Sequence, residues 1–304
     1  IYTLSLHDAL PIFDWERMSL IKKKEELPIK ETVLGAIYGI PGVGKSTIAL
    51  SMPKPLLLDT DRGLYRVQPE YRTDSVPVET YQDILDVLNE DLSGYKTIVI
   101  DTLGKLVDLI SDKVCADNPK FVQPDGTMSL RAWGLIKIEF KNLIKAIERL
   151  NKNFILVAHE KEVMEGDSRI IRPDVSGSAA KDIIKELDFL GYMEVVGKKR
   201  SISFTPSSKF YAKNSLGLDS YVEIPILAKG DNNTFLTDYI LNPTIERRKN
   251  EFKVAITYEE VLKQAKEIIA KEGVTEESKN KLRALPKIND SKLKIKAMLD
   301  EASK

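Results

Sequence analysis

The chain has 304 residues, 42% of them hydrophobic, which is enough for one sizeable core and an appendage. Lysine plus arginine and aspartate plus glutamate each total 46, so the formal net charge is zero and no overall basic field predicts a nucleic-acid partner. The single cysteine, Cys115, excludes an intrachain disulfide and favours a reducing, cytoplasmic setting, and no apolar run approaches the roughly 18 residues of a membrane span.

The first residues of the chain need a separate explanation. Residues 1–12, IYTLSLHDALPI, are apolar but lack the basic start of a signal peptide. They are also the translation, residue by residue, of the end of a common sequencing adapter, whose last base fits the codon of Phe13. We therefore expect residues 1–12 to be an adapter artefact and residues 13–31 a lead-in to the core, with Met18 as the start. That leaves His159 as the one histidine native to the protein.

Short apolar runs alternate with helical patterns along most of the chain. Buried strands are expected at residues 32–39, 55–59, 76–80, 95–102 and 153–160. Helices are expected over residues 45–52, 81–92, 103–116 and 129–150. This alternation predicts an α/β fold with a mostly parallel central sheet, in which ligands bind at the carboxyl ends of the strands.

Two later regions depart from this alternation. A mobile loop is expected over residues 161–179, followed by a helix and then antiparallel strands up to about residue 215. From about residue 241 charged residues dominate, and Thr257–Glu260 has the pattern of a helix capping box. We expect a core over residues 32–240 and a small, solvated helical appendage over residues 241–304.

A glycine-rich run, GIPGVGKST, follows the first strand. Its residues 39–46 match the phosphate-binding pattern G-x-x-x-x-G-K-[ST] in the expected position between a strand and a helix. Glycines let backbone N–H groups converge on phosphate oxygens, Lys45 neutralises the β- and γ-phosphates, and Ser46 supplies a hydroxyl ligand for Mg²⁺. The predicted ligands are therefore ATP and Mg²⁺, and the predicted binding residues are Gly39, Pro41, Gly42, Val43, Gly44, Lys45, Ser46 and Thr47.

A second magnesium ligand is expected at the end of the strand TIVID. Asp101 follows four apolar-strand residues, which is the Walker B pattern. The next residue is Thr102 rather than a glutamate that could orient water, so the catalytic base must come from elsewhere in the chain. Asp59 and Asp61 are candidates for this base, because they follow the second strand and should lie near the phosphates.

With LLLDTDRGL at residues 56–64, the sequence resembles the RecA-like P-loop ATPases of AAA type. It resembles especially the phage nucleotide-binding proteins related to single-strand annealing recombinases, and the resemblance covers residues 32 to about 218. It implies that Asp61 is the catalytic base, in place of the glutamate of bacterial RecA, although a turn acid before Gly63 is an equal reading. It also implies that His159, at the end of FILVAH, senses the γ-phosphate, unless that histidine has a structural partner.

The same resemblance suggests contacts with DNA and with a neighbouring subunit. The loop after the sensor offers Arg169, Arg172 and Lys181 to single-stranded DNA, and an earlier loop offers Lys120, Phe121, Arg131 and Trp133; both are equally well read as ordinary surface loops. Besides Lys45, no cation of the chain is obviously placed near the γ-phosphate. RecA-like proteins obtain one from a neighbour, for which SSKFYAKN offers Lys213 first and Lys209 second, unless both merely solvate a hairpin.

These observations predict a Mg²⁺-dependent ATPase that converts ATP to ADP and phosphate and is stimulated by single-stranded DNA. Its expected setting is DNA recombination, single-strand annealing or replication, as a homo-oligomer with phage replication or recombination proteins in the cytoplasm of an infected bacterium. Two alternatives stay open: a nucleotide-gated assembly protein with little hydrolysis, and a helicase or helicase loader. A GTPase is disfavoured because no N-K-x-D follows a strand, and a small-molecule kinase because no arginine-rich lid is evident.

Overall fold

The computed structural model describes residues 27–175 and 179–251, together with residues 263, 276 and 280. The expectations for residues 1–12 and for the helices beyond residue 251 lie outside these residues. Within them, Glu31–Arg247 form one compact unit. None of the helices described is long and apolar enough to cross a membrane. The division of the chain at residue 240 stays a prediction.

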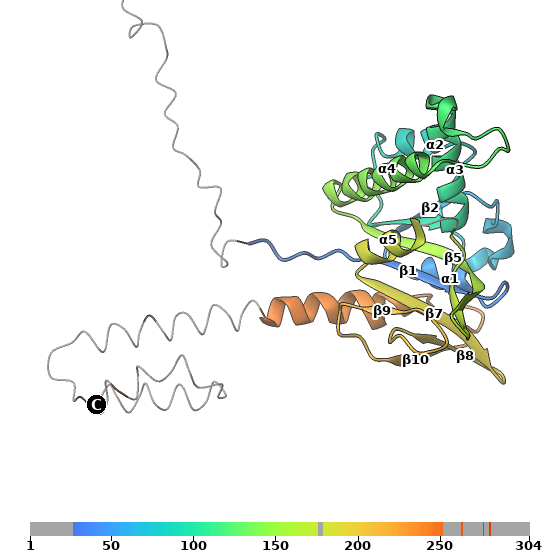
Figure 1. Cartoon of the computed structure of the whole chain (residues 1–304). Coiled ribbons are helices and arrows are strands. Elements are labelled where there is room, and N and C mark those ends of the chain that lie inside the picture. The colour runs from blue at the N-terminus through green and yellow to red at the C-terminus, as the bar shows by residue number, and fades with distance from the viewer. Residues whose placement is uncertain (1–26, 176–178, 252–262, 264–275, 277–279, 281–304) are drawn as a thin grey trace, which may run out of the picture. The chain divides into compact units, whose positions relative to one another are not determined.

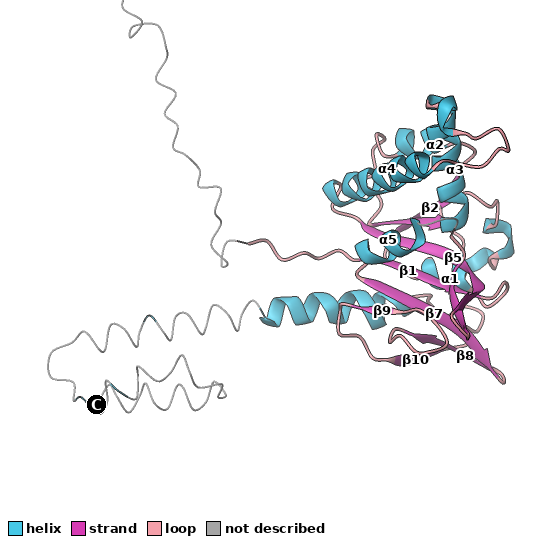
Figure 2. Ribbon diagram, viewed as in Figure 1, coloured by secondary structure: helices cyan, strands magenta, loops and turns pink. Residues whose placement is uncertain are grey.

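The unit is built from strands that alternate with helices (Figures 1 and 2). The strands are β1 (Leu34–Gly39), β2 (Pro55–Asp59), β3 (Ser75–Pro77), β4 (Thr97–Asp101), β5 (Asn153–Glu165), β6 (Ser168–Pro173), β7 (Phe189–Val196), β8 (Lys199–Ser203), β9 (Lys213–Asn214) and β10 (Tyr221–Ile224). The helices are α1 (Lys45–Ala49), α2 (Tyr81–Val87), α3 (Leu103–Asp117), α4 (Leu130–Arg149) and α5 (Ala179–Glu186), followed by a π-helical turn at Thr237–Leu241.

Eight of the strands follow one another in the sheet in the order β10-β8-β7-β1-β5-β4-β2-β3, while β6 pairs with β5 and β9 with β7. From β7 to β3 every neighbouring pair is parallel, whereas β8 and β10 are antiparallel to their neighbours. The predicted α/β fold with a mostly parallel sheet is therefore confirmed. Because β5 lies between β1 and β4, the strand that precedes the glycine-rich loop is separated from the strand that ends in Asp101.

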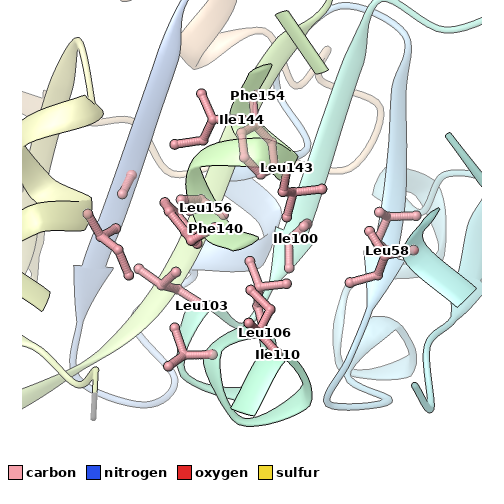
Figure 3. Packing of buried hydrophobic residues seen from close by; sticks show 14 of the residues in the cluster. Leu58, Ile100, Leu103, Leu106, Ile110, Phe140, Leu143, Ile144, Phe154 and Leu156 are labelled. Atoms are coloured by element: carbon pink, nitrogen blue, oxygen red, sulfur yellow. The ribbon is translucent and has the colours of Figure 1, made fainter. Parts of the chain in front are cut away.

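Strand residues alternate between two hydrophobic clusters, one on each face of the sheet. On one face, Leu58, Ile100, Phe154 and Leu156 pack against the long helices α3 and α4, as Figure 3 shows. On the other face, odd-numbered residues of the same strands pack with α1 and with the segment that contains Phe235 and Leu236. Burial on both faces explains why these strands are continuous apolar runs, and each fully buried Leu, Ile or Phe contributes about 1.5–3 kcal/mol.

Three expectations about secondary structure are corrected. Residues 161–173 are not a mobile loop, because β5 continues to Glu165 and turns back as β6, with Glu160 opposite Pro173 and Glu165 opposite Ser168. The strand after α5 is not antiparallel throughout: β7 pairs in parallel with β1 and in an antiparallel manner with β8 and β9. Finally, α1 ends at Ala49, a turn earlier than the apolar pattern suggests.

Candidate active site

The glycine-rich loop connects the carboxyl end of β1 to the first turn of α1. Gly42 and Gly44 have φ angles of 81° and 95°, which side-chain-bearing residues rarely adopt. Gly39 is required for a different reason, since a Cβ there would lie 2.2 Å from the carbonyl oxygen of Met193 on β7. Val43 is buried in the cluster on the α1 face and anchors the loop. The backbone conformation of a phosphate-binding loop is therefore present.

Lys45 points back into this loop. Only 6% of the residue is exposed, and its Nζ donates hydrogen bonds to the carbonyl oxygens of Gly39 at 2.9 Å and Ile40 at 2.7 Å. Burial lowers the pKa of its ammonium group, while the carboxylates of Asp101 and Glu160 act in the opposite direction. A desolvated cation held inside a loop of backbone N–H groups attracts an anion more strongly than an exposed lysine does.

Ser46 and Asp101 come together, as the sequence predicts. The Ser46 hydroxyl donates a hydrogen bond of 2.5 Å to Oδ2 of Asp101, although the two residues belong to α1 and β4. Asp101 is 7% exposed, and burial raises the pKa of its carboxyl, against which the bond from Ser46 acts. One carboxylate and one hydroxyl, completed by phosphate oxygens and water, form a donor set that suits Mg²⁺.

The end of β2 is tied to the end of β4. Thr60 donates its N–H to the carbonyl oxygen of Asp101 at 2.9 Å, and its hydroxyl accepts a 2.7 Å bond from the N–H of Thr102. The buried Asp59 accepts the N–H groups of Gly63 at 2.8 Å and Leu64 at 3.0 Å. Asp59 therefore shapes the turn after β2, and its oxygens are already engaged.

Asp61 lies on that turn, close enough to Asp101 to raise the pKa of that carboxyl. Its side chain is 32% exposed, and its Oδ2 lies 3.0 Å from Nη1 of Arg66 in an ion pair. To act on water, this carboxylate would have to keep its position while sharing its charge with the guanidinium. Its role as the catalytic base stays a prediction.

His159 ends the buried part of β5 and lies in register with Gly39, the first residue of the loop. Its Nδ1 is buried and has no hydrogen-bond partner among the residues that the structure describes. Its backbone carbonyl, in contrast, accepts the N–H of Asp174 at 2.8 Å. The imidazole is thus beside the phosphate loop with an unused nitrogen, and its role as a γ-phosphate sensor stays a prediction.

Glu160 is a site residue that the sequence reasoning missed. It interacts electrostatically with Lys45, and it forms a hydrogen bond with the hydroxyl of Tyr192, whose pKa is raised to about 12 mainly by burial. Burial also raises the pKa of the Glu160 carboxyl, and its Oε2 lacks a partner among the described residues. The signal was present in the sequence, because two ionisable residues, His159 and Glu160, come directly after the buried first part of β5.

The candidate DNA contacts lie on the hairpin formed by β5 and β6 and beyond it. Arg169 is exposed, 3.8 Å from Glu162, whereas Nε of Arg172 is buried without a partner among the described residues. Lys181 lies in α5, and its side chain is outside the description. Between residues 160 and 173 the acids Glu160, Glu162, Glu165 and Asp167 outnumber the bases Lys161, Arg169 and Arg172.

The earlier loop is held together by contacts with an aromatic ring. The cations of Lys120 and Arg131 lie 5.5 and 5.7 Å from the ring centre of Phe121, and Trp133 packs against the core. These contacts provide a structural role for the residues, and their role in DNA binding stays a prediction.

Lys213 lies away from the loop. Its strand β9 pairs with the first residues of β7, at the amino edge of the sheet, and its Nζ donates 2.7 Å to the carbonyl oxygen of Lys185 at the end of α5. The exposed side chain of Lys209 makes no ion pair or hydrogen bond with the described residues. The contacts within one chain do not decide between the two lysines, so both Lys213 and Lys209 as trans-acting cations stay predictions.

A glycine-rich loop with a buried lysine, closed by a serine and a strand-end aspartate on a parallel sheet, defines a P-loop nucleotide-binding protein. The family model of the AAA domain matches residues 32–216, more than half of the chain. The chain therefore belongs to this AAA-domain family. No curated protein matches it. The narrower resemblance to phage annealing proteins stays a prediction.

Proposed function

We propose that this chain is a Mg²⁺-dependent ATPase that hydrolyses ATP to ADP and phosphate. The observation that carries the proposal is the 2.5 Å hydrogen bond between Ser46 and Asp101, next to the loop that holds Lys45. Two remote elements meet there in the arrangement that P-loop enzymes use for a metal and a triphosphate. The AAA-domain match supports nucleotide binding at the same residues.

On binding ATP, Lys45 exchanges its bonds with the carbonyl oxygens of Gly39 and Ile40 for bonds with phosphate oxygens. The N–H groups of the loop orient the phosphates, and Ser46 and Asp101 hold the metal. Mg²⁺, when bound, neutralises charge on the β- and γ-phosphate oxygens. We assign the buried Nδ1 of His159, which has no partner among the described residues, to the phosphate or the attacking water.

Two carboxylates compete for the role of water-activating base. The resemblance assigns the role to Asp61, whereas Glu160 is a candidate because it interacts electrostatically with Lys45 and because burial raises the pKa of its carboxyl. Single-turnover hydrolysis by Asp61→Asn and Glu160→Gln separates them. The variant without its base should bind ATP normally and hydrolyse it about 100-fold or more slowly.

A nucleotide-gated binding protein with little hydrolysis is the second candidate. It is favoured by the ion pair of Asp61 with Arg66 and by Thr102, which cannot act as a base after Asp101. Such a protein should bind ATP tightly with Mg²⁺ and release almost no phosphate, with or without DNA.

We also propose, from the resemblance, that the ATPase assembles on single-stranded DNA and acts with phage recombination or replication proteins. The exposed guanidinium of Arg169 supports a contact with the DNA backbone at the β5–β6 hairpin. Because acids outnumber bases in this hairpin, the contact with DNA would be confined to a few side chains. If Lys209 or Lys213 reaches the neighbour's site, mixing Lys45→Ala with either lysine variant restores activity. Co-assembly without recovery would contradict a trans-acting lysine.

The central experiment measures phosphate release by the wild-type protein with Mg²⁺ or EDTA and with or without single-stranded DNA. We expect turnover that requires Mg²⁺ and rises with DNA. Asp101→Asn should shift the Mg²⁺ requirement to higher concentrations. ATP that neither binds nor turns over would contradict the proposed function, and turnover indifferent to DNA would contradict its DNA part alone.

A further inference from the structure

A second cation from the same chain contacts the phosphate loop. Arg200 lies on β8, opposite Val195 of β7 and Ile224 of β10. Residues opposite each other on antiparallel strands share a face, and Ile224 is buried in the cluster on the α1 face. The Arg200 side chain is therefore directed to the face of the sheet from which α1 and the loop emerge.

The distances place its guanidinium directly against Gly44. A Cβ added at Gly44 would lie 2.6 Å from Nη1 of Arg200 and 3.8 Å from its Cζ. On its other side, Nη2 donates a hydrogen bond of 3.1 Å to the carbonyl oxygen of Pro225, which follows β10. The guanidinium is thus held at one nitrogen and presented to the loop by another.

Nothing described in the structure neutralises this cation. Arg200 forms no ion pair with a carboxylate among the described residues, whereas its neighbour Lys199 pairs with Glu223 at 2.9 Å. Lys45 brings a second positive charge to the same loop. Two cations on one loop repel each other unless an anion lies between them, and a guanidinium presents the N–H geometry that phosphate oxygens accept.

We infer that Arg200 is a phosphate-binding residue, supplied in cis by β8, that contacts the α- and β-phosphates of the bound nucleotide. The inference rests on the proposed nucleotide-binding function. The assignment to these phosphates follows from Gly44, because the backbone of this part of a P-loop cradles the α- and β-phosphates while the lysine reaches the β- and γ-phosphates.

Arg200 also joins the edge of the sheet to the nucleotide. One nitrogen lies against Gly44 and another donates to the carbonyl oxygen of Pro225, so a single side chain links the segment after β10 to the proposed phosphate site. A trans-acting lysine is then not needed for the α- and β-phosphates and would serve the γ-phosphate alone.

The test compares Arg200→Ala and Arg200→Lys with the matched variant Lys199→Ala, which removes an adjacent, exposed cation of β8. Dissociation constants are measured with fluorescent methylanthraniloyl derivatives of ATP and ADP, and melting temperatures are recorded in parallel. We expect Arg200→Ala to weaken both nucleotides by roughly 10- to 100-fold, since a charge-assisted hydrogen bond is lost. Arg200→Lys should retain part of the affinity, and Lys199→Ala should bind like the wild type.

The outcomes separate the inference from the proposed function. If the wild type binds both nucleotides and Arg200→Ala binds them with the same affinity, the inference is overturned and the proposed function is left intact. A loss for ATP alone would overturn the assignment to the α- and β-phosphates. A lower melting temperature with unchanged affinity would show that Arg200 only holds Pro225. Failure of the wild type to bind either nucleotide would overturn the proposed function itself.

Discussion

Buried polar groups differ between the amino edge of the sheet, where the parallel strands begin, and its carboxyl edge, where they end. At the amino edge, the Asn153 side chain accepts the N–H of Val33 at 3.0 Å and donates to the carbonyl oxygen of Lys96 at 3.2 Å and the hydroxyl of Thr97 at 3.4 Å. Asp188 accepts the N–H of Leu34 at 2.9 Å. These bonds join β1, β4 and β5 at their starts, so the polar groups at this edge stabilise the fold.

At the carboxyl edge, several polar groups either lack a hydrogen-bond partner among the described residues or carry a charge that burial disfavours. Nδ1 of His159 and Oε2 of Glu160 lack partners among the described residues, burial raises the pKa of Asp101, and burial lowers that of Lys45. Each of these features costs folding free energy in the absence of a ligand. The difference is that the polar side chains at the amino edge tie the strands together, whereas at the carboxyl edge His159 and Glu160 keep unused atoms near the phosphate loop.

Among the changes at the carboxyl edge, removal of Lys45 should have the largest effect on ATP binding. Lys45→Ala should raise the dissociation constant for ATP by about 100-fold or more, since it deletes the buried cation of the loop. Calorimetric titration measures the affinity, and circular dichroism checks the fold. Affinity within a few-fold of the wild type would contradict the assignment of the loop.

Removal of Asn153 at the amino edge should instead lower the stability of the fold. Asn153→Ala leaves the buried N–H of Val33 without its acceptor and should lower the free energy of unfolding by about 3 kcal/mol. Urea denaturation measures this loss. Asn89→Ala is the matched control, because this exposed amide follows α2 and donates a hydrogen bond to the Leu85 carbonyl oxygen of that helix. Nucleotide affinity of the folded Asn153→Ala protein should equal that of the wild type, and a large loss would contradict the comparison.

Neutralising Asp101 should raise the melting temperature of the ligand-free protein and weaken its stabilisation by Mg²⁺ and ATP. Burial raises the folded-state pKa of this carboxyl above its unfolded value, so stability is lost as the pH rises from about 4 through the folded pKa. Without ligand, Asp101→Asn should therefore melt roughly 2–4 °C higher than the wild type at pH 8, and the difference should vanish near pH 4. With Mg²⁺ and ATP the order should reverse, because the wild type gains more from binding. An Asp101→Asn protein that melts lower at pH 8 would contradict this account.

Replacing His159 should have the smallest effect on folding and a selective effect on turnover. His159→Ala removes a nitrogen that has no partner among the described residues, so the melting temperature should change little. The turnover number should fall about tenfold, with little change in ATP affinity, and turnover should no longer respond to single-stranded DNA. A preserved DNA response would return His159 to a structural role.

The positions of most strands and helices could be predicted because the buried strands are apolar runs bounded by glycine, proline and acids. The β5–β6 hairpin could not, since its outer residues, such as Lys161 and Glu162, are charged on both faces and carry no alternating signal. The hairpin forms because the buried first half of β5 continues outward and its own chain pairs with it. The direction of β7 likewise depends on its pairing with β1, far away in the sequence.

The sequence by itself determined the phosphate loop, because Gly39, Lys45 and Ser46 are neighbours in the chain and their roles follow from local backbone geometry. The sequence also predicted Asp101 as a magnesium ligand, since an acid that ends a buried strand after such a loop has few other roles. Only the tertiary structure decided that Glu160 interacts with Lys45, that Arg200 contacts Gly44, and that Lys213 lies at the opposite edge. The physical reason is that strand order and register bring distant residues together, and no local pattern encodes which strands become neighbours.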